Sequence, residues 1–141
     1  MLDPKNEMAI AVAMNTMENP GGLARSLAGL MGKRMGAKEY AAPEGETIDL
    51  SDYAGTYVAQ PWGRDYVVLP WAGGLIAVTP SEDDIAGEIR TRAKPLGNDR
   101  FQIMTDKGEE REVITYHRDA EGNVTHSERH GQYSYRKGPL P

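Results

Sequence analysis

The sequence of 141 residues contains no cysteine, which excludes disulfide bonds and thiolate chemistry. It leaves the compartment open, because a domain of this size can fold without disulfides. An excess of basic residues is also lacking, since 16 lysines and arginines are outnumbered by 21 aspartates and glutamates. Without a basic stripe to gather phosphate groups, nucleic acid is not expected as a partner.

Long hydrophobic runs are absent too. The longest apolar run covers residues 8–14, which is too short to cross a bilayer. No basic segment precedes this run, as one would in a signal peptide. We therefore expect no membrane span.

The first 36 residues have the pattern of one strand and one helix. Residues 8–14 are nearly all apolar, which indicates a strand covered on both faces or a buried helical turn. Asn19 can cap a helix with Pro20 in its first turn, and Gly36 can end it. The apolar residues between these signals fall on one stripe at helical spacing and predict an amphipathic helix: Leu23, Leu27, Leu30, Met31 and Met35.

A segment without apolar periodicity, residues 37–49, follows this block. Alanine, proline, glycine and acidic residues dominate it, which is typical of a linker. We therefore predict three parts of the chain: residues 1–36, a linker over residues 37–49, and a β domain over residues 50–141.

From Leu50 onward, short alternating runs are separated by turn residues about every ten positions, a pattern that predicts antiparallel strands. Such a meander removes its exposed edges most easily by closing on itself. The fold class predicted is mainly β, with an antiparallel, lipocalin-like barrel of about eight strands preceded by a short strand and an amphipathic helix. The predicted strands cover residues 53–59, 65–71, 74–80, 87–95, 100–105, 110–118, 123–129 and 132–137.

Aromatic residues are concentrated in the first two of these strands and their connection. They form either the filled core of the barrel or the lining of a cup that binds a small ligand. We favour the core, because barrels of about eight strands are often filled by their own side chains. As candidate ligand-binding residues they are Tyr53, Tyr57, Trp62, Tyr66 and Trp71.

Metal-ligand residue types also occur near the C-terminus. His117, His126 and His130 lie in this region together with Asp119. The spacing of four between His126 and His130 would pair two ligands on a helix, but in a strand it is only same-side alternation. We therefore expect neither a metal site nor another cofactor.

Three short motifs stand out in the β domain: Tyr-x-Gly-x-Tyr at residues 53–57, Asp-Arg-Phe at residues 99–101 and Arg-Asp-Ala-Glu-Gly at residues 118–122. With these motifs the domain resembles the small lipocalin-like domain at the C-terminus of serine hydrolases of the beta-lactamase and penicillin-binding-protein type. The first 36 residues resemble the last strand and helix of the catalytic domain of that family. The resemblance implies a bacterial protein whose catalytic motifs lie upstream of this chain. Such a protein is expected in the cytoplasm or in the periplasm, depending on an upstream signal.

The active site of that family has no counterpart in this sequence. Residues 134–137 match its Ser-x-x-Lys motif by letter, but they lie in a predicted strand and not at the start of a helix. No residue is therefore assigned as catalytic, and we expect the chain itself not to be an enzyme. An enzyme with an unrecognised site is the lowest-ranked hypothesis.

Two functions follow as hypotheses. The first is a non-catalytic accessory domain that covers or shapes the substrate cleft of its parent serine hydrolase, with that catalytic domain as its partner. The alternative is an independent lipocalin-like module that binds a small apolar or peptidoglycan-like ligand. A homodimer through residues 8–35 is also expected, because the apolar stripe of the predicted helix needs a surface to cover it.

Overall fold

The computed structural model describes residues 2–3, 8–9, 27, 29, 31–32, 34, 39–61, 65–79 and 88–138. The chain divides into two compact units, and each is described by itself. The first unit is formed by Met1–Lys38 and Pro80–Glu88, and the second by Glu39–Thr79 and Ile89–Pro141. Among the described residues, no helix is long and apolar enough to span a membrane.

In the first unit, two short strands form an antiparallel pair. They are β1 (Leu2–Asp3) and β2 (Met8–Ala9), with Leu2 opposite Ala9. The predicted strand over residues 8–14 thus begins in β2, and its remaining residues lie outside the described ones.

The predicted amphipathic helix lies mostly outside the described residues, as do Leu23, Leu30 and Met35 of its stripe. Five residues between 27 and 34 are described and have helical backbone, and Met31 among them is 44% exposed. An amphipathic helix that buries an apolar stripe is therefore not confirmed.

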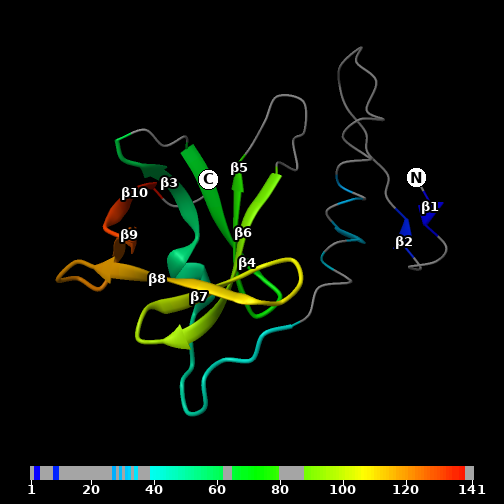
Figure 1. Ribbon diagram of the computed structural model, residues 1–141, viewed down its shortest axis with the longest axis horizontal. Coiled ribbons are helices and arrows are strands. Elements are labelled where there is room, and N and C mark those ends of the chain that lie inside the picture. The colour runs from blue at the N-terminus through cyan, green and yellow to red at the C-terminus, as the bar shows by residue number, and fades with distance from the viewer. Residues whose placement is uncertain are drawn as a thin grey trace. The chain divides into compact units, whose positions relative to one another are not determined.

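The second unit is a closed barrel of eight strands in the order β10-β3-β4-β5-β6-β7-β8-β9 (Figure 1). The prediction of a mainly β fold with an eight-stranded antiparallel barrel is confirmed, because each predicted strand overlaps one observed strand. The strands are β3 (Gly55–Ala59), β4 (Asp65–Trp71), β5 (Gly74–Thr79), β6 (Glu88–Gly97), β7 (Arg100–Met104), β8 (Glu110–Arg118), β9 (Val124–Arg129) and β10 (Gln132–Gly138).

Tight turns make this meander possible. The turn between β9 and β10 consists of His130 and Gly131, whose φ angles are 50° and 71°. Two successive residues with positive φ match the right-handed twist of the strands that they join. Short connections of this kind force neighbouring strands to run antiparallel, so the turn residues in the sequence determine most of the topology.

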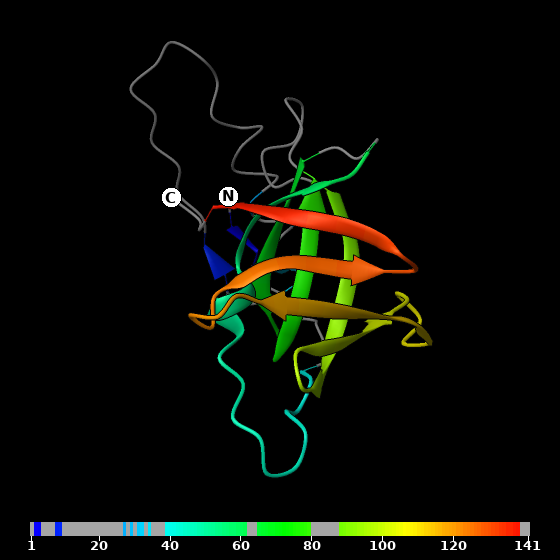
Figure 2. The same cartoon turned by 90° about the vertical axis from the view of Figure 1, so that its left-hand side faces the viewer.

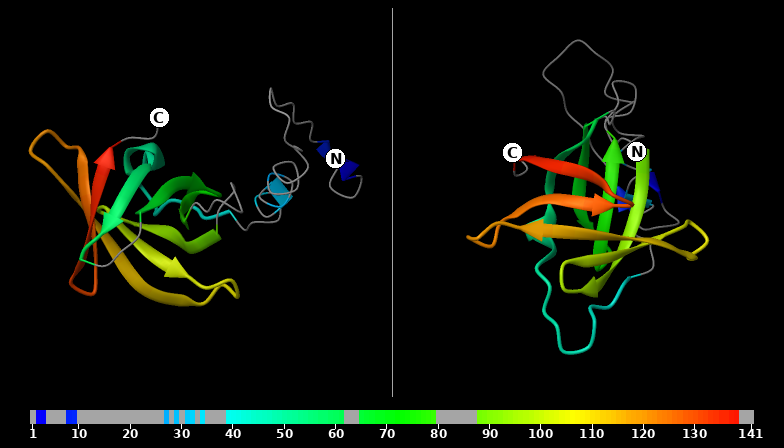
Figure 3. Two further views of the ribbon diagram at one scale, coloured as in Figure 1. Left: turned by 90° about the horizontal axis from the view of Figure 1, so that it is seen from above. Right: turned by 60° about the vertical axis from the view of Figure 1, so that its left-hand side comes forward.

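The two ends of the barrel differ in what lies there. Connections in an antiparallel meander alternate between the ends, so the β4–β5, β6–β7 and β8–β9 turns lie at one end and the β7–β8 and β9–β10 turns at the other. The 3-10 helix η2 (Leu50–Tyr53) comes directly before β3 and therefore lies at the first end, which we call the η2 end. The other is called the β7–β8 end; Figure 3 shows the β7–β8 and β9–β10 hairpins there.

The stretch before η2 packs against the barrel. The backbone N–H of Tyr40 donates to the carbonyl oxygen of Ala72 at 2.7 Å, and a Cβ atom on Gly73 would lie 1.9 Å from the carbonyl oxygen of Tyr40. Ile48 packs against the core, and Asp49 caps η2 by accepting a hydrogen bond from the N–H of Ser51 at 2.9 Å. The predicted linker therefore makes specific contacts, while the boundaries at residues 36, 49 and 50 stay a prediction.

An aromatic cluster fills the barrel near the η2 end. The Tyr53 ring meets the Phe101 and Tyr116 rings edge to face, with ring centroids 4.8 Å and 5.0 Å apart. Tyr57 is fully buried beside them. Large rings in edge-to-face contact contribute both buried area and favourable quadrupole interactions, so this half of the barrel has a close-packed core.

Candidate functional site

An ionic network at the η2 end joins the three motifs that carried the family resemblance. The Tyr53 hydroxyl donates to Asp99 Oδ1 at 2.6 Å, and Arg118 Nε donates to both Asp99 oxygens at 3.0 and 3.2 Å. Arg118 Nη1 also donates to Asp52 Oδ2 at 3.1 Å and to the carbonyl oxygen of Gly122 at 2.7 Å. The Tyr57 hydroxyl donates to the carbonyl oxygen of Tyr53 at 2.8 Å. These residues tie η2 to two turns, which is a structural role.

The tyrosines of this end are held in the neutral form. Burial, followed by the hydrogen bond to Asp99, raises the pKa of Tyr53 to about 12. Burial also raises the pKa values of Tyr57 and Tyr116. A phenol with a raised pKa stays protonated near neutral pH and cannot accept a proton there, so these three tyrosines do not act as general bases.

A cavity of about 270 Å³ opens inside the barrel at the β7–β8 end. Cross-strand pairing places its residues on the inner face: Tyr66 lies opposite the buried Tyr57, and Ser134 lies opposite both Ser127 and Ala59. Residues directly opposite one another project to the same face of a sheet. The lining consists of Ala59, Tyr66, Ala77, Thr91, Ile114, Ser127, Arg129, Gln132 and Ser134.

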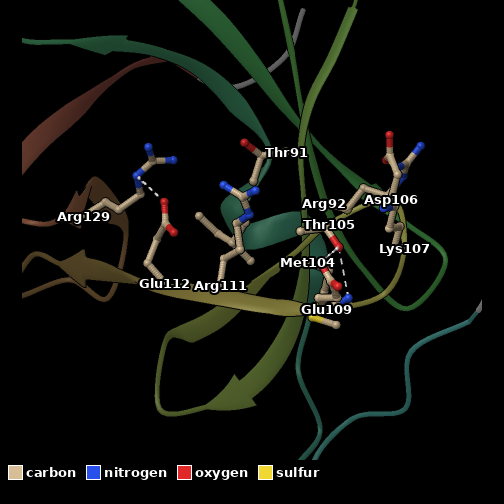
Figure 4. Close-up of a pocket in the computed structure, with 11 residues that line it drawn as sticks. Thr91, Arg92, Met104, Thr105, Asp106, Lys107, Glu109, Arg111, Glu112 and Arg129 are labelled. Atoms are coloured by element: carbon tan, nitrogen blue, oxygen red, sulfur yellow. Dashed lines mark hydrogen bonds and ion pairs between the residues drawn. The ribbon is translucent and has the colours of Figure 1, made fainter.

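A second hollow of about 570 Å³ lies beside this cavity and shares Thr91 and Arg129 with it (Figure 4). Its lining is mostly charged and comes from β6 to β9 and from the β7–β8 turn. The further residues are Arg92, Ile103, Met104, Thr105, Asp106, Lys107, Glu109, Arg111 and Glu112. Together the two hollows have the size at which small-molecule sites usually occur.

A β-bulge in β8 shapes this second hollow. The pairing of β7 with β8 shifts register between Gln102, opposite Val113, and Met104, opposite Glu110. Two residues of β8, Arg111 and Glu112, therefore lie opposite the single residue Ile103. A bulge interrupts the alternation of a strand and can turn two successive side chains toward one side, and both of these side chains line the hollow in Figure 4.

Gln102 holds this bulge from β7. Its side chain is 8% exposed, and its Nε2 atom donates to the carbonyl oxygens of Arg111 and, at 3.3 Å, of Glu112. Bulged residues lose part of the ladder of backbone hydrogen bonds. The buried amide of Gln102 takes the place of these backbone hydrogen bonds and fixes the backbone positions of Arg111 and Glu112.

The charges of the hollow are only partly paired. Arg92 forms an ion pair with Asp106, and Arg129 Nε lies 3.4 Å from Glu112 Oε1. A hydrogen bond from its own backbone N–H, followed by the positive charge of Arg129, lowers the pKa of Glu112. Arg111 forms no ion pair within the described part of the chain, and its guanidinium extends between the two pairs in Figure 4.

The five aromatic candidates of the sequence analysis are distributed over different places. Tyr53 and Tyr57 are buried in the core cluster near the η2 end. Tyr66 is half-buried and lines the 270 Å³ cavity, whereas Trp71 is half-buried at the end of β4 and is not part of that lining. Trp62 lies outside the described residues. A role of these residues in ligand binding stays a prediction. Of the four that the structure describes, Tyr66 alone lines the cavity.

The histidines form a cluster on the outer face of the barrel. The His117 and His126 rings stack with centroids 4.5 Å apart, and His117 Nε2 lies 3.2 Å from Glu128 Oε2. His130 is in the β9–β10 turn, and Asp119 Oδ1 accepts hydrogen bonds within the β8–β9 turn. Within the described ranges, no group of three or more His, Cys, Asp or Glu side chains could hold a metal ion.

The Ser-x-x-Lys letters at residues 134–137 fall on opposite faces of β10. Ser134 lines the cavity inside the barrel, whereas Lys137 Nζ donates to Asp65 Oδ2 at 2.6 Å. Residues three apart on a strand project to opposite faces, so this geometry does not bring the lysine to the serine hydroxyl.

Alternation in the sequence could have indicated Ser127, Arg129, Gln132 and Ser134 as inward-facing residues of the last two strands. Arg111 could not have been found in this way, because its position depends on the bulge. Comparisons of the chain with protein-family models, curated proteins and solved structures find no match.

Proposed function

We propose that the barrel is a lipocalin-like binding module that takes a small molecule at its β7–β8 end. The observation that carries this proposal is the 270 Å³ cavity lined by inward-facing side chains. Among the described residues, the fully buried aromatic rings cluster near the η2 end, and the cavity in the other half has room for a ligand.

The chemistry of the lining indicates a ligand with an apolar part and several hydrogen-bonding groups. Ala59, Ala77 and Ile114 provide apolar surface, while Ser127 and Ser134 provide hydroxyl groups. The amide of Gln132 and the guanidinium of Arg129 add further hydrogen-bond donors. An acetamido sugar of the peptidoglycan type combines these properties.

Titration of the ¹⁵N-labelled full chain with N-acetylglucosamine and with benzamide tests the proposal. Saturable amide shifts are expected at lining residues such as Ile114 and Ser127, and not at Asp99 near the η2 end. Ala77→Phe should fill the cavity and abolish these shifts. The same substitution at the exposed Ala120, in the β8–β9 turn, should leave binding unchanged.

Thermal unfolding of both variants separates loss of the site from loss of the fold. A folded Ala77→Phe protein that binds as the unsubstituted chain does would contradict the proposal. The same holds for a chain that shows no saturable shift with either probe.

A second candidate is the accessory-domain role implied by the family resemblance. One observation favours it: large side chains are exposed on the outer face of β8 and β10, which lie on either side of β9 in Figure 2. Val113 is 38% exposed, Tyr133 40% and Tyr135 49%. Exposed tyrosines are enriched where proteins contact one another, and the catalytic domain of a parent serine hydrolase is the partner proposed.

The reading frame upstream of this chain tests the second candidate. It should encode a helix that begins with Ser-x-x-Lys, and co-expression with that segment should protect Tyr133 and Tyr135 from solvent. The present chain alone should hydrolyse neither a chromogenic beta-lactam nor an aryl ester. Hydrolysis that disappears in Ser134→Ala would contradict this candidate.

A further inference from the structure

We propose that the site at the β7–β8 end selects a ligand with a single carboxylate and binds that carboxylate on Arg111 and Arg129. This inference rests on the proposed ligand-binding function and names the chemical class of the ligand. Its basis is that Arg111, one of the two bulged residues of β8, and Arg129 both line the hollow beside the cavity.

Both guanidinium groups have donors to spare. Arg111 forms no ion pair with any described residue, and Arg129 contacts Glu112 through its Nε atom at 3.4 Å. A guanidinium offers five N–H donors in a planar fork that matches the two oxygens of a carboxylate. Arg129 lines both hollows, so a carboxylate held there leaves the rest of a ligand free to enter the barrel.

The charge balance favours a monoanion. Four cationic side chains (Arg92, Lys107, Arg111, Arg129) and three anionic ones (Asp106, Glu109, Glu112) line the hollow, a net charge of +1. The whole chain carries −5, so the hollow is positive on an acidic protein. One bound carboxylate makes the hollow neutral, whereas a bound phosphate dianion would leave it with a net negative charge.

Gln102 acts as a positioning residue. Its buried amide donates to the carbonyl oxygens of both bulged residues, and the amide would be left without a partner if the bulge moved, which is unfavourable for a buried donor. Without this amide, the bulge loses two hydrogen bonds that stabilise it. Arg111 then takes the outward position that it would have in a regular strand. The amide therefore determines whether Arg111 lines the hollow.

Benzoate and its neutral analogue benzamide provide the test, with affinities taken from titrations of the ¹⁵N-labelled full chain. Benzoate is expected to bind more tightly than benzamide. Arg111→Gln should weaken benzoate by roughly threefold to tenfold and leave benzamide unchanged. Arg100→Gln, at an exposed arginine on β7 outside both hollows, is the matched control and should change neither affinity.

Two further variants test the arrangement independently. Glu112→Gln should strengthen benzoate binding, because it removes the carboxylate that competes for Arg129. Gln102→Met, which keeps the length of the side chain and removes the amide, should abolish the preference for benzoate while benzamide still binds. A general loss of stability would instead reduce both affinities together.

Each alternative result has a definite meaning. Equal affinities for benzoate and benzamide would refute the carboxylate site and leave the binding module intact, whereas binding of neither these probes nor N-acetylglucosamine would refute both. Competition by inorganic phosphate that is stronger than competition by acetate would contradict the charge argument.

Discussion

Asp99 is the residue at which the contribution of the ionic network at the η2 end to the stability of the fold can be measured. It accepts hydrogen bonds from Tyr53 and from Arg118, and its φ angle is 58°. Asparagine tolerates this left-handed region as well as aspartate does. Asp99→Asn therefore removes the charge while it keeps the backbone and the shape of the side chain.

The expected loss of stability follows from the two contacts. The hydrogen bond from the Tyr53 hydroxyl loses its charged acceptor and with it about half of its strength, or about 1 kcal/mol. The pair with Arg118 is partly exposed, with side-chain exposures of 28% and 30%, and contributes about 0.5–1 kcal/mol. Arg118 keeps Asp52 and the carbonyl oxygen of Gly122, so the total is about 1.5–2 kcal/mol.

Urea unfolding at neutral pH measures this loss, and the thermal midpoint should fall by roughly 10 °C. The control is Asp65→Asn, which removes an ion pair with Lys137 whose two side chains are 50% and 52% exposed. It should cost less than about 0.5 kcal/mol. If Asp99→Asn cost no more than this control, the network would not hold η2 in place, and the reasoning would be refuted.

Three further predictions concern pH and association. The pKa of Tyr53 is raised from 10.0 to about 12 in the folded protein, so the unfolded chain releases this proton at lower pH. The free energy of unfolding should therefore fall as pH rises from 10 toward 12. Urea unfolding should show a smaller fall for Tyr53→Phe. Burial and then the charge of His117 lower the pKa of His126 below 6.5. The contribution of neutral His126 to the free energy of unfolding should therefore be complete above pH 6.5 and be lost in more acidic solution. His126→Gln should reduce this loss, and an unchanged dependence of stability on pH in the variant would contradict the prediction. Light scattering should show a dimer through residues 8–35 that dissociates in Leu27→Glu; a monomer for both proteins would exclude it.

The barrel could be predicted from the sequence because its strands and turns are encoded locally. Alternation in β8 and the Gly97-Asn98-Asp99 turn, with three successive positive φ angles, are visible within a few residues. The contacts of residues 39–49 could not be predicted. They depend on the close approach of Tyr40 to Gly73, which no local pattern reports.

The site was less predictable than the fold for the same reason. Tyr53 and Tyr66 have similar neighbours in the sequence, yet one fills the core and the other lines the cavity. Whether an inward-facing residue lies in the filled half of the barrel or beside the cavity depends on which end η2 packs against. Arg111 is the clearest case, because strict alternation places it on the outer face, and the register shift opposite Ile103 that alters its position cannot be read from a local pattern.

Closure of the barrel between β10 and β3 has a consequence for biosynthesis. The Arg136 guanidinium donates to the carbonyl oxygen of Ala54, which is 82 positions earlier in the chain. On the ribosome, β3 is therefore complete long before the strand that covers its free edge has left the exit tunnel. During this interval the edge can pair with other nascent chains. Synthesis rate and chaperone access during the interval before β10 emerges should thus influence the yield of folded protein more than substitutions inside the early hairpins do.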